Sequence, residues 1–366
     1  MKTYPLKQMS LEEAMKKQFK LIDCICNEFN GAQFLNMGDL GVVQLNNKPM
    51  TTEKVERVLA DFFHVEKALL VTGAGTGAMR NALYSMVKTN GTVLVHKAPI
   101  YPTTLELLKD KGIKIVETDY HDVNEIEKVL AKETIDCAII QHTRQKPEDR
   151  YDIQNVIHTI KQYKNISILT DENYAVMKVP RIGAEMGADV SAFSAFKLLG
   201  PEGIGVIVGK KSLLDEIEHK NYSGGSKVQG WQAMEVLRSL VYVPVMQAIQ
   251  SNVNQEIILK LKNMKIKEIK DVFLANAQSN VIIVEFENEI AAEVLYEAER
   301  LGAAPNPVGA ESKYEVIPMF YRVSGTFRNY DPTLVKRMIR INPMRSGADT
   351  VINILKTSIE RARKCL

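Results

Sequence analysis

A lysine in an apolar, glycine-rich stretch is the first residue with chemistry to explain. Lys197 stands in SAFSAFKLLGPEGIGVIVG, residues 191–209, among small and apolar side chains. Partial removal from water makes an ammonium group easier to deprotonate, and a neutral amine attacks carbonyl groups to form a Schiff base. The alternative is a lysine at a strand edge whose charged end reaches water. Lys197 is therefore a candidate nucleophile, provided that other residues supply its partners.

A glycine-rich segment, TGAGTGAMRNAL at residues 72–83, could bind an anion. Its glycines permit a tight turn, and backbone N–H groups at a helix start attract negative charge. The residues concerned are Gly75, Thr76 and Gly77. The segment is neither a Walker A loop, because GK[ST] is missing, nor a GxGxxG fingerprint. A turn that simply requires glycine is the alternative interpretation.

An aromatic ring and a carboxylate complete the set. Tyr101, in HKAPIYPTT, could stack on a flat ligand, or it could be a packed loop tyrosine. Asp171 ends the apolar run ISILTD and could hold a cationic ring nitrogen, or it could cap a turn. An anion cradle, a stacking ring, a carboxylate and a lysine together suit a flat, phosphorylated aldehyde with a cationic ring. Pyridoxal 5′-phosphate is such a ligand.

The elements that must position these residues alternate along the chain. Short apolar runs, each followed by a helical pattern or a loop, occupy residues 68–72, 92–96, 113–118, 136–141 and 166–171. This alternation predicts an α/β fold with a parallel sheet covered by helices on both faces. Ligands of such sheets bind at the carboxyl ends of the strands, which is where the four candidates fall.

Three parts of the chain are expected. Residues 1–45 form an N-terminal helical arm, 46–250 a large cofactor-binding domain, and 251–366 a small C-terminal α/β domain. A helix that begins near Trp231 is expected to bend or end at Pro244, because proline lacks a backbone N–H group.

Composition narrows the function classes. The net charge of the 366 residues is only +3, and no basic stripe predicts nucleic-acid binding. No run of about 18 apolar residues predicts a membrane span, and the N-terminal residues do not resemble a signal peptide. The four cysteines and six histidines form no CxxC or HxxxH pair, so neither a disulfide framework nor a metal site is expected. A cytoplasmic, reduced protein is the expectation.

The chain resembles the fold type I superfamily of pyridoxal-phosphate enzymes, and more narrowly its class V aminotransferase-like group, near the selenocysteine synthase branch. The likeness covers roughly residues 45–360 and is most specific in DENYAVMKVPRIGAEMGADVSAFSAFKLLGPEGIGVIVG, residues 171–209. The resemblance implies a mainly parallel seven-stranded sheet between helices, with a smaller C-terminal α/β domain.

The resemblance also implies roles for individual residues. Lys197 would bond to the cofactor aldehyde and later move protons at the substrate α-carbon, while Asp171 would pair with the protonated pyridine nitrogen. Tyr101 would stack on the ring. Contacts to the phosphate are expected from Gly75, Thr76, Gly77 and Ser194. For the ring 3′-oxygen the candidates are Gln141, His142 and Thr143, of which Thr143 is included in the predicted site.

Further implied residues reach beyond the cofactor. In relatives, a loop like Ser223, Gly224 and Gly225 contacts the phosphate of the neighbouring subunit, which predicts a homodimer or higher homo-oligomer with shared sites. Arg340 would grip the substrate α-carboxylate through its planar guanidinium, although an interdomain ion pair is its alternative role. Arg345 is the rival candidate.

Two departures from the family pattern bear on the reaction. Phe196 and Tyr174 stand where many relatives carry histidine. No cysteine falls in an expected substrate loop, and Cys365 lies at a chain end that is a poor place for a nucleophile. A cysteine desulfurase is therefore disfavoured. The mild charge balance likewise gives no sign of the tRNA surface that a selenocysteine synthase needs.

The predicted function is a pyridoxal-phosphate enzyme acting on a small amino acid or amino sugar acid. Transamination leads because it needs only the residues found, and β-elimination or an ammonia-lyase reaction is the alternative. A racemase would need a second acid–base group, for which Tyr101 or Tyr174 is available. A non-catalytic binding or regulatory relative is disfavoured by intact Lys197 and Asp171. A nucleotide-binding α/β protein is disfavoured by the missing fingerprints.

Overall fold

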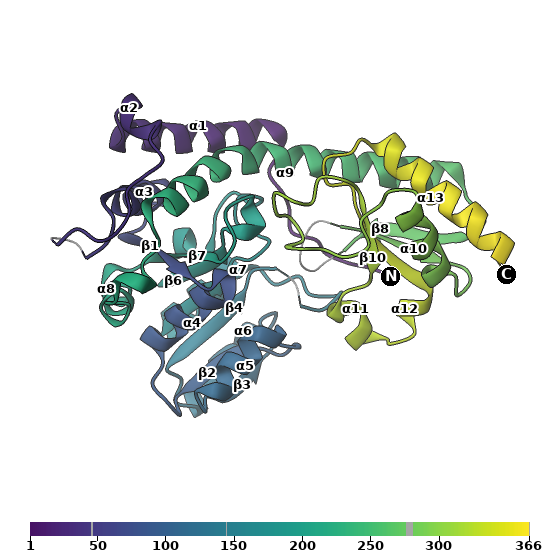
Figure 1. Cartoon of the computed structure of the whole chain (residues 1–366). Coiled ribbons are helices and arrows are strands. Elements are labelled where there is room, and N and C mark those ends of the chain that lie inside the picture. The colour runs from purple at the N-terminus through teal and green to yellow at the C-terminus, as the bar shows by residue number, and fades with distance from the viewer. Residues whose placement is uncertain (45–46, 144, 276–280, 366) are drawn as a thin grey trace. The chain divides into compact units, whose positions relative to one another are not determined.

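Figure 1 shows a computed structural model, which describes residues 1–44, 47–143, 145–275 and 281–365. The chain divides into two compact units. The larger comprises residues 12–143 and 150–244, and the other, here called the C-terminal unit, comprises residues 1–11, 144–149 and 245–366. The division at residues 45 and 250 expected from the sequence stays a prediction, and the two units have somewhat different bounds.

The larger unit is built on a seven-stranded sheet in the order β1-β7-β6-β5-β4-β2-β3. Only β7 runs antiparallel to its neighbours β1 and β6, while the other strands are parallel to one another. The mainly parallel sheet expected from the sequence is thereby confirmed. The strands are β1 (Lys67–Thr72), β2 (Thr92–His96), β3 (Lys114–Thr118), β4 (Cys137–Gln141), β5 (Ser167–Asp171), β6 (Val190–Ser194) and β7 (Ile204–Gly209).

Both faces of this sheet are buried, which explains its nearly continuous apolar strands. Along β7, Ile204, Val206 and Val208 pack into one apolar cluster and Ile207 into another on the opposite face. The helices of the unit are α1 (Leu11–Glu28), α2 (Gly31–Phe34), α3 (Met50–Phe62), α4 (Ala74–Met86), α5 (Pro102–Asp110), α6 (Val123–Lys132), α7 (Ile153–Tyr163) and α8 (Lys211–Lys220), with short 3-10 turns at η1 (Gly183–Met186), η2 (Phe196–Leu198) and η3 (Gly224–Ser226).

Two glycines bring α4 against the sheet. A Cβ atom on Gly77 would lie 2.2 Å from the carbonyl oxygen of Thr72, and one on Gly205 would lie 2.2 Å from that of Ala74. Both contacts are with backbone, so only glycine permits this approach. The first turn of α4 is thereby held directly beyond the carboxyl end of β1.

The C-terminal unit contains a four-stranded antiparallel sheet in the order β10-β11-β9-β8. Its strands are β8 (Ile269–Leu274), β9 (Ile282–Phe286), β10 (Met319–Arg322) and β11 (Met338–Asn342). Its helices are α10 (Ala291–Arg300), α11 (Gly325–Tyr330), α12 (Leu334–Arg337) and α13 (Ala348–Ala362), followed by η4 (Arg363–Cys365). The smaller α/β domain predicted at the C-terminal end is thus confirmed. The apolar run NVIIVEF, residues 280–286, predicts a strand, which β9 confirms, but its first residue, Asn280, lies outside the described residues.

The long helix α9 (Gly230–Met264) continues through Pro244, so of the two outcomes expected there, a bend or an end, the end is wrong. Proline removes one intrahelical hydrogen bond, which a helix secured by packing on both sides can sustain. The boundary between the two units falls directly after this proline. No helix within the described residues is long and apolar enough to cross a membrane.

Candidate active site

Lys197 lies just beyond the carboxyl end of β6, in the turn η2. Its Nζ atom is 4.1 Å from the ring centroid of Tyr174 and 6.0 Å from that of Tyr101. Tyr101 reaches this position as the residue before Pro102, which begins α5 with a backbone dihedral suited to a helix start. The two rings remove part of the water around the ammonium group, as its candidate role requires.

Asp171 ends β5 and is 7% exposed. Its Oδ1 atom accepts hydrogen bonds from the backbone N–H of Asn173 at 3.0 Å and from Asn173 Nδ2 at 2.7 Å. Burial raises the pKa of Asp171 above its ordinary value, although the hydrogen bonds from Asn173 and the charge of Lys197 oppose this rise. In the described part of the chain both hydrogen bonds reach Oδ1, which leaves Oδ2 for a cationic partner.

The first turn of α4 forms the predicted anion cradle. The N–H groups of Gly73 and Ala74 both donate to the carbonyl oxygen of Gly203. Those of Gly75 and Thr76 make no hydrogen bond to any described residue, as the geometry of a helix start dictates. These free donors and the positive end of the helix suit a phosphate group.

The floor of the cradle leaves no room for a side chain at Gly75. A Cβ atom there would lie 2.8 Å from Asn173 Oδ1 and 3.1 Å from Ser194 Cβ. Ser194, at the end of β6, donates its backbone N–H to Asn173 Oδ1 at 3.2 Å. Free amides, a buried carboxylate and a lysine between aromatic rings are together the groups that pyridoxal 5′-phosphate requires.

The loop after β4 separates the three candidates for the ring 3′-oxygen. Nδ1 of His142 lies 2.6 Å from Oε2 of the fully buried Glu172, so this imidazole is already engaged. Gln141 Nε2 donates to Thr143 Oγ1 at 3.2 Å. Gln141 and Thr143 therefore remain the better candidates, and the contact of Thr143 with the cofactor stays a prediction.

The loop of Ser223, Gly224 and Gly225 is exposed. Within the described residues no hydrogen bond or ion pair joins it to Lys197 or to the cradle of its own protomer. A Cβ atom on Gly224 would lie 3.6 Å from Val42 Cγ1, so this loop borders the segment between α2 and α3. Its role toward a neighbouring subunit stays a prediction.

The two candidate arginines belong to the C-terminal unit. Arg340 donates from Nε to the carbonyl oxygen of Arg322 at 2.6 Å, and its guanidinium carbon lies 4.1 Å from the ring centroid of Tyr321. Arg345 donates from Nη1 to Gln250 Oε1 at 3.0 Å, and burial lowers its pKa below the ordinary value. A role of either residue in binding substrate stays a prediction.

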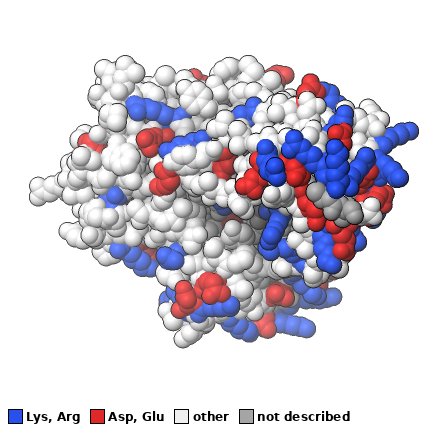
Figure 2. Space-filling view, turned by 45° about the vertical axis from the view of Figure 1, so that its right-hand side comes forward, with Lys and Arg blue, Asp and Glu red and all other residues white. Residues whose placement is uncertain are grey.

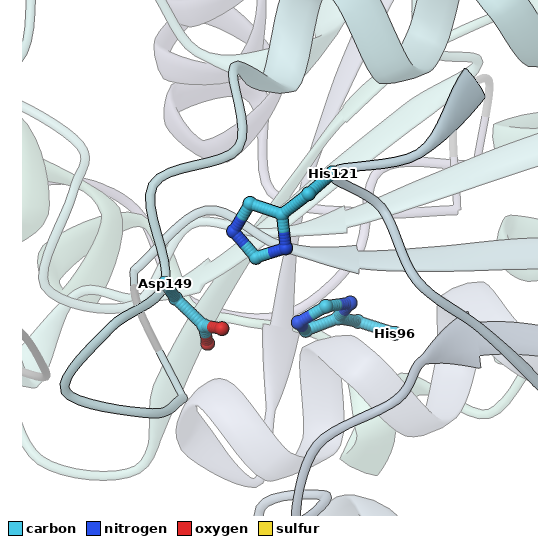
Figure 3. Close-up of side chains that lie close together, drawn as sticks. All are labelled: His96, His121 and Asp149. Atoms are coloured by element: carbon cyan, nitrogen blue, oxygen red, sulfur yellow. The ribbon is translucent and has the colours of Figure 1, made fainter.

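Two histidines of the larger unit have their rings edge to face, with centroids 5.4 Å apart (Figure 3). His96 Nδ1 accepts a hydrogen bond from the backbone N–H of Tyr120, and His121 Nε2 accepts one from that of Arg150. A neutral imidazole has one acceptor nitrogen, and here a backbone amide occupies it in both residues. This arrangement does not favour a metal on the pair. Asp149, also labelled in Figure 3, belongs to the C-terminal unit.

Sequence reasoning missed two residues in this region. Asn173 contacts both Asp171 and Ser194, and Glu172 binds His142 and the backbone N–H of Gly183. Their position in the sequence could have indicated them, since both directly follow Asp171. Tyr174, noted in the sequence as a departure from the family pattern and as an available acid–base group, has a left-handed backbone with φ of 68° and faces Lys197.

Comparisons with known proteins agree with this architecture. The family described as Aminotransferase class-V matches residues 42–241, and YhfS-like, C-terminal domain, matches residues 255–355. Protein YhfS of Escherichia coli is 50% identical over 359 residues, covering 98% of this chain and 99% of the relative. A crystal structure described as that of the pyridoxal-5′-phosphate-dependent protein YhfS from Escherichia coli has a TM-score of 0.97 and 49% identity. It covers 98% of this chain and 99% of that one.

A partial likeness to another activity also exists. A protein named as a probable cysteine desulfurase of Halalkalibacterium halodurans is 31% identical over 131 residues, but this covers only 33% of this chain and 28% of that protein.

Fold and site together define a pyridoxal-phosphate enzyme of fold type I, in agreement with the sequence resemblance. The chain belongs to the class-V aminotransferase family, whose match spans more than half of it. Pyridoxal 5′-phosphate is its cofactor, for which Lys197, Asp171 and the first turn of α4 are the fitting residues.

Proposed function

We propose that this enzyme transfers the amino group of a small amino acid or related amine to a keto acid. The observation that carries the proposal is Lys197, placed between the rings of Tyr101 and Tyr174 in the same unit as the buried Asp171. When bound, pyridoxal phosphate supplies an electron sink for negative charge at the substrate α-carbon. Lys197 is the group that removes and returns the α-proton, and Asp171 supplies a negative charge for the ring nitrogen.

The surroundings of Lys197 support its proposed role in proton transfer. Proton transfer at the substrate α-carbon needs a group that reaches it, and the Nζ atom of Lys197 is held 4.1 Å from the ring centroid of Tyr174 and 6.0 Å from that of Tyr101. Tyr101 is only partly exposed, and burial, with the nearby charge of Asp171, raises the pKa of its hydroxyl group. Tyr101 therefore stays neutral and acts as a flat apolar surface.

The three cysteines whose side chains the structure describes give no support for a desulfurase. Burial raises the pKa of Cys24 to about 11 and that of Cys137 to about 12. Both thiols stay protonated near neutral pH, and a protonated thiol is a poor nucleophile. Cys26 is exposed, but it lies on the N-terminal helix α1.

Elimination from the same substrates is the second candidate. The partial likeness to a protein named as a probable cysteine desulfurase supports it, because removal of the α-proton by Lys197 would serve both reactions. A non-catalytic relative is disfavoured, because the lysine and the aspartate are both retained.

Labelled amino acids separate these candidates. Purified enzyme would be incubated with 15N-labelled amino acids, singly, with and without a keto acid acceptor. Transamination places the label on the acceptor, whereas elimination releases labelled ammonia without any acceptor. Lys197→Ala should abolish either outcome. Labelled ammonia alone would replace the proposal by elimination, and no turnover across a broad panel would leave a binding role.

We also propose that the enzyme is a homodimer whose sites are shared. The apolar side chains of Leu35, Met37, Leu40 and Val42 are exposed in the segment from the end of α2 toward α3, of which Val42 borders the loop 223–225, and Tyr222 is 72% exposed. Exposed apolar side chains that gather on a surface mark interaction sites. In Figure 2 the left-hand part of the view is mostly uncharged, whereas side chains of both signs crowd the right-hand part.

A further inference from the structure

Asn173 lies where the three parts of the cofactor site meet. Its side-chain nitrogen donates to Asp171 Oδ1 at 2.7 Å, and its side-chain oxygen accepts the backbone N–H of Ser194 at 3.2 Å. The same side chain fills the space into which a Cβ atom on Gly75 would project. One amide therefore contacts the carboxylate for the ring nitrogen, the strand that leads to Lys197, and the phosphate-binding turn.

The orientation of this amide is set by its partners. Its oxygen receives a backbone N–H, which can only donate, and its nitrogen faces a carboxylate, which in the ionised state can only accept. Reversing the amide would place donor against donor and acceptor against acceptor. The orientation of the Asn173 amide is thus fixed by two groups from different strands, the carboxylate of Asp171 and the backbone N–H of Ser194.

The contact with Asp171 has two effects. The backbone and side-chain donors of Asn173 both bind Oδ1, so the carboxylate cannot rotate and Oδ2 remains directed elsewhere. Hydrogen bonds to the charged form also stabilise ionisation. Around Asp171 the charge of Lys197 acts in the same sense, while burial and the charge of Glu172 act in the opposite sense.

The contact with Gly75 sets the distance between the Asn173 side chain and the first turn of α4. A methyl group there would lie 2.8 Å from Asn173 Oδ1, closer than real Cβ contacts allow. The asparagine and the first turn of α4 therefore touch, with Ser194 beneath them. Rigid positioning of this kind is what a functional site requires of its supporting residues.

We propose that Asn173 is a positioning residue that ties the ring-nitrogen carboxylate Asp171 to the phosphate-binding turn at Gly75, so that both ends of the cofactor are held in register. This inference rests on the binding of pyridoxal phosphate at the site described above, and it assigns a function to a residue outside the predicted set.

Asn173→Ala tests the inference through properties of the protein that do not depend on turnover. The cofactor affinity should fall about tenfold to a hundredfold, the range expected from a lost hydrogen bond to a charged group. Carbon-13 NMR of the apo-protein should show a higher pKa for Asp171 than in the wild type. The control is Thr170→Val, which removes the buried hydrogen bond between the hydroxyl groups of Thr170 and Ser191, one residue before Asp171. This control should leave both quantities unchanged.

The outcomes are distinguishable. If Asn173→Ala binds the cofactor like the wild type and leaves the pKa of Asp171 unchanged, the positioning role is wrong. If the wild-type protein fails to bind pyridoxal phosphate, the assignment of the cofactor fails instead. A general loss of fold would appear as a fall in the apo-protein melting temperature, which the Thr170→Val control calibrates.

A size exchange gives an independent test. Gly75→Ala alone should weaken cofactor binding, because its methyl group meets Asn173. In the double variant with Asn173→Ala the obstacle is gone, so the combined loss should be smaller than the product of the two single losses. Strictly multiplicative losses would show that the two residues are not coupled and would overturn the inference.

Discussion

Asp171 is the residue whose charge the protein controls most closely. Burial in the sheet disfavours its ionised form, while two donors from Asn173 and the nearby Lys197 favour it. If Asp171 holds the ring nitrogen as proposed, that cation would be a further favourable partner, and the cofactor and the carboxylate would stabilise each other's charge. The alternative role for Asp171 is that of a turn cap. Binding of the ring nitrogen and capping of a turn predict different consequences when Asp171 is replaced.

Replacing Asp171 with alanine should leave the protein folded and reduce kcat about 10²- to 10³-fold, the usual loss when a preorganised charge is removed from an active site. Steady-state kinetics and thermal unfolding would be measured together. Asp152→Ala is the matched control, since Asp152 caps α7 through the N–H of Asn155. That variant should lose about 1 kcal/mol of stability and keep its rate. If Asp171→Ala and Asp152→Ala had similar kinetics, the role of Asp171 would be only that of a turn cap.

Among single residues, the sequence predicted those whose neighbours in the chain are unusual, and it missed those whose role depends on contacts with residues distant in the chain. Lys197 and Gly75 stand in unusual local contexts, a lysine among apolar residues and a glycine at a helix start. Asn173 is unremarkable in the sequence, because its importance comes from Ser194 and Gly75, which only the folded sheet brings to it.

Among the elements, α4 is positioned with little tolerance. Gly77→Ala should cost roughly 1–3 kcal/mol of stability, because its methyl group meets the carbonyl oxygen of Thr72 and the backbone must shift. Cofactor affinity should fall as well, since the displaced turn carries the phosphate-binding amides. Denaturant unfolding and a cofactor titration would measure both. Gly31→Ala, where no atom lies within 4 Å, should change neither. Unchanged affinity in Gly77→Ala would argue against the cradle.

A buried aspartate connects three segments of the larger unit. Asp189 accepts hydrogen bonds from Lys161 of α7, from Lys210 after β7 and from the backbone of Ile168 in β5. Burial opposes ionisation, but these donors lower the pKa of Asp189 below its ordinary value. A depressed pKa stabilises the folded state above the unfolded-state value of about 3.9, and this stabilisation is lost as the pH falls through the folded-state value.

Unfolding free energies between pH 7 and pH 3 would test this connection. Asp189→Asn should be less stable than the wild type at pH 7 by about 1–3 kcal/mol, and the two curves should converge below pH 4. Asp110→Asn, a change at the exposed end of α5, is the control and should follow the wild type. A constant gap between Asp189→Asn and the wild type at every pH would contradict the electrostatic explanation.

Element prediction succeeded where burial on both sides produces long apolar runs, as in β1, β2, β4 and β5. It failed for β8 and β10 of the C-terminal unit. In β8 only Val272 is buried, so the run IKDVFL carries no clear period. The helix α9 was expected to bend or end at its proline, and it does not end there because the packing of its flanking turns outweighs that local cost.

At the scale of the whole molecule, the proposed dimer makes a stoichiometric prediction. Lys197→Ala and Gly224→Glu should each be inactive alone, the second because it adds negative charge where a phosphate is expected. Co-expressed at equal levels, half of the dimers are mixed and each mixed dimer has one intact shared site, so about a quarter of wild-type activity should return. If the loop serves its own protomer, every mixture stays inactive. Analytical ultracentrifugation would confirm that the tested species are dimers.

The close approach of α4 and β7 also limits how this enzyme can diversify. At Gly77 and Gly205 an added methyl group would meet a carbonyl oxygen of the main chain, which no repacking of neighbouring side chains can move aside. In a mutant library made to select for new substrates, most variants at these two positions would be destabilised. Gln141 and Tyr174 are only partly buried, and they lie next to the candidate site, Gln141 paired with Asp171 in the sheet and Tyr174 facing Lys197. We therefore expect altered substrate preference to be selectable at those positions while the cofactor-binding frame stays constant.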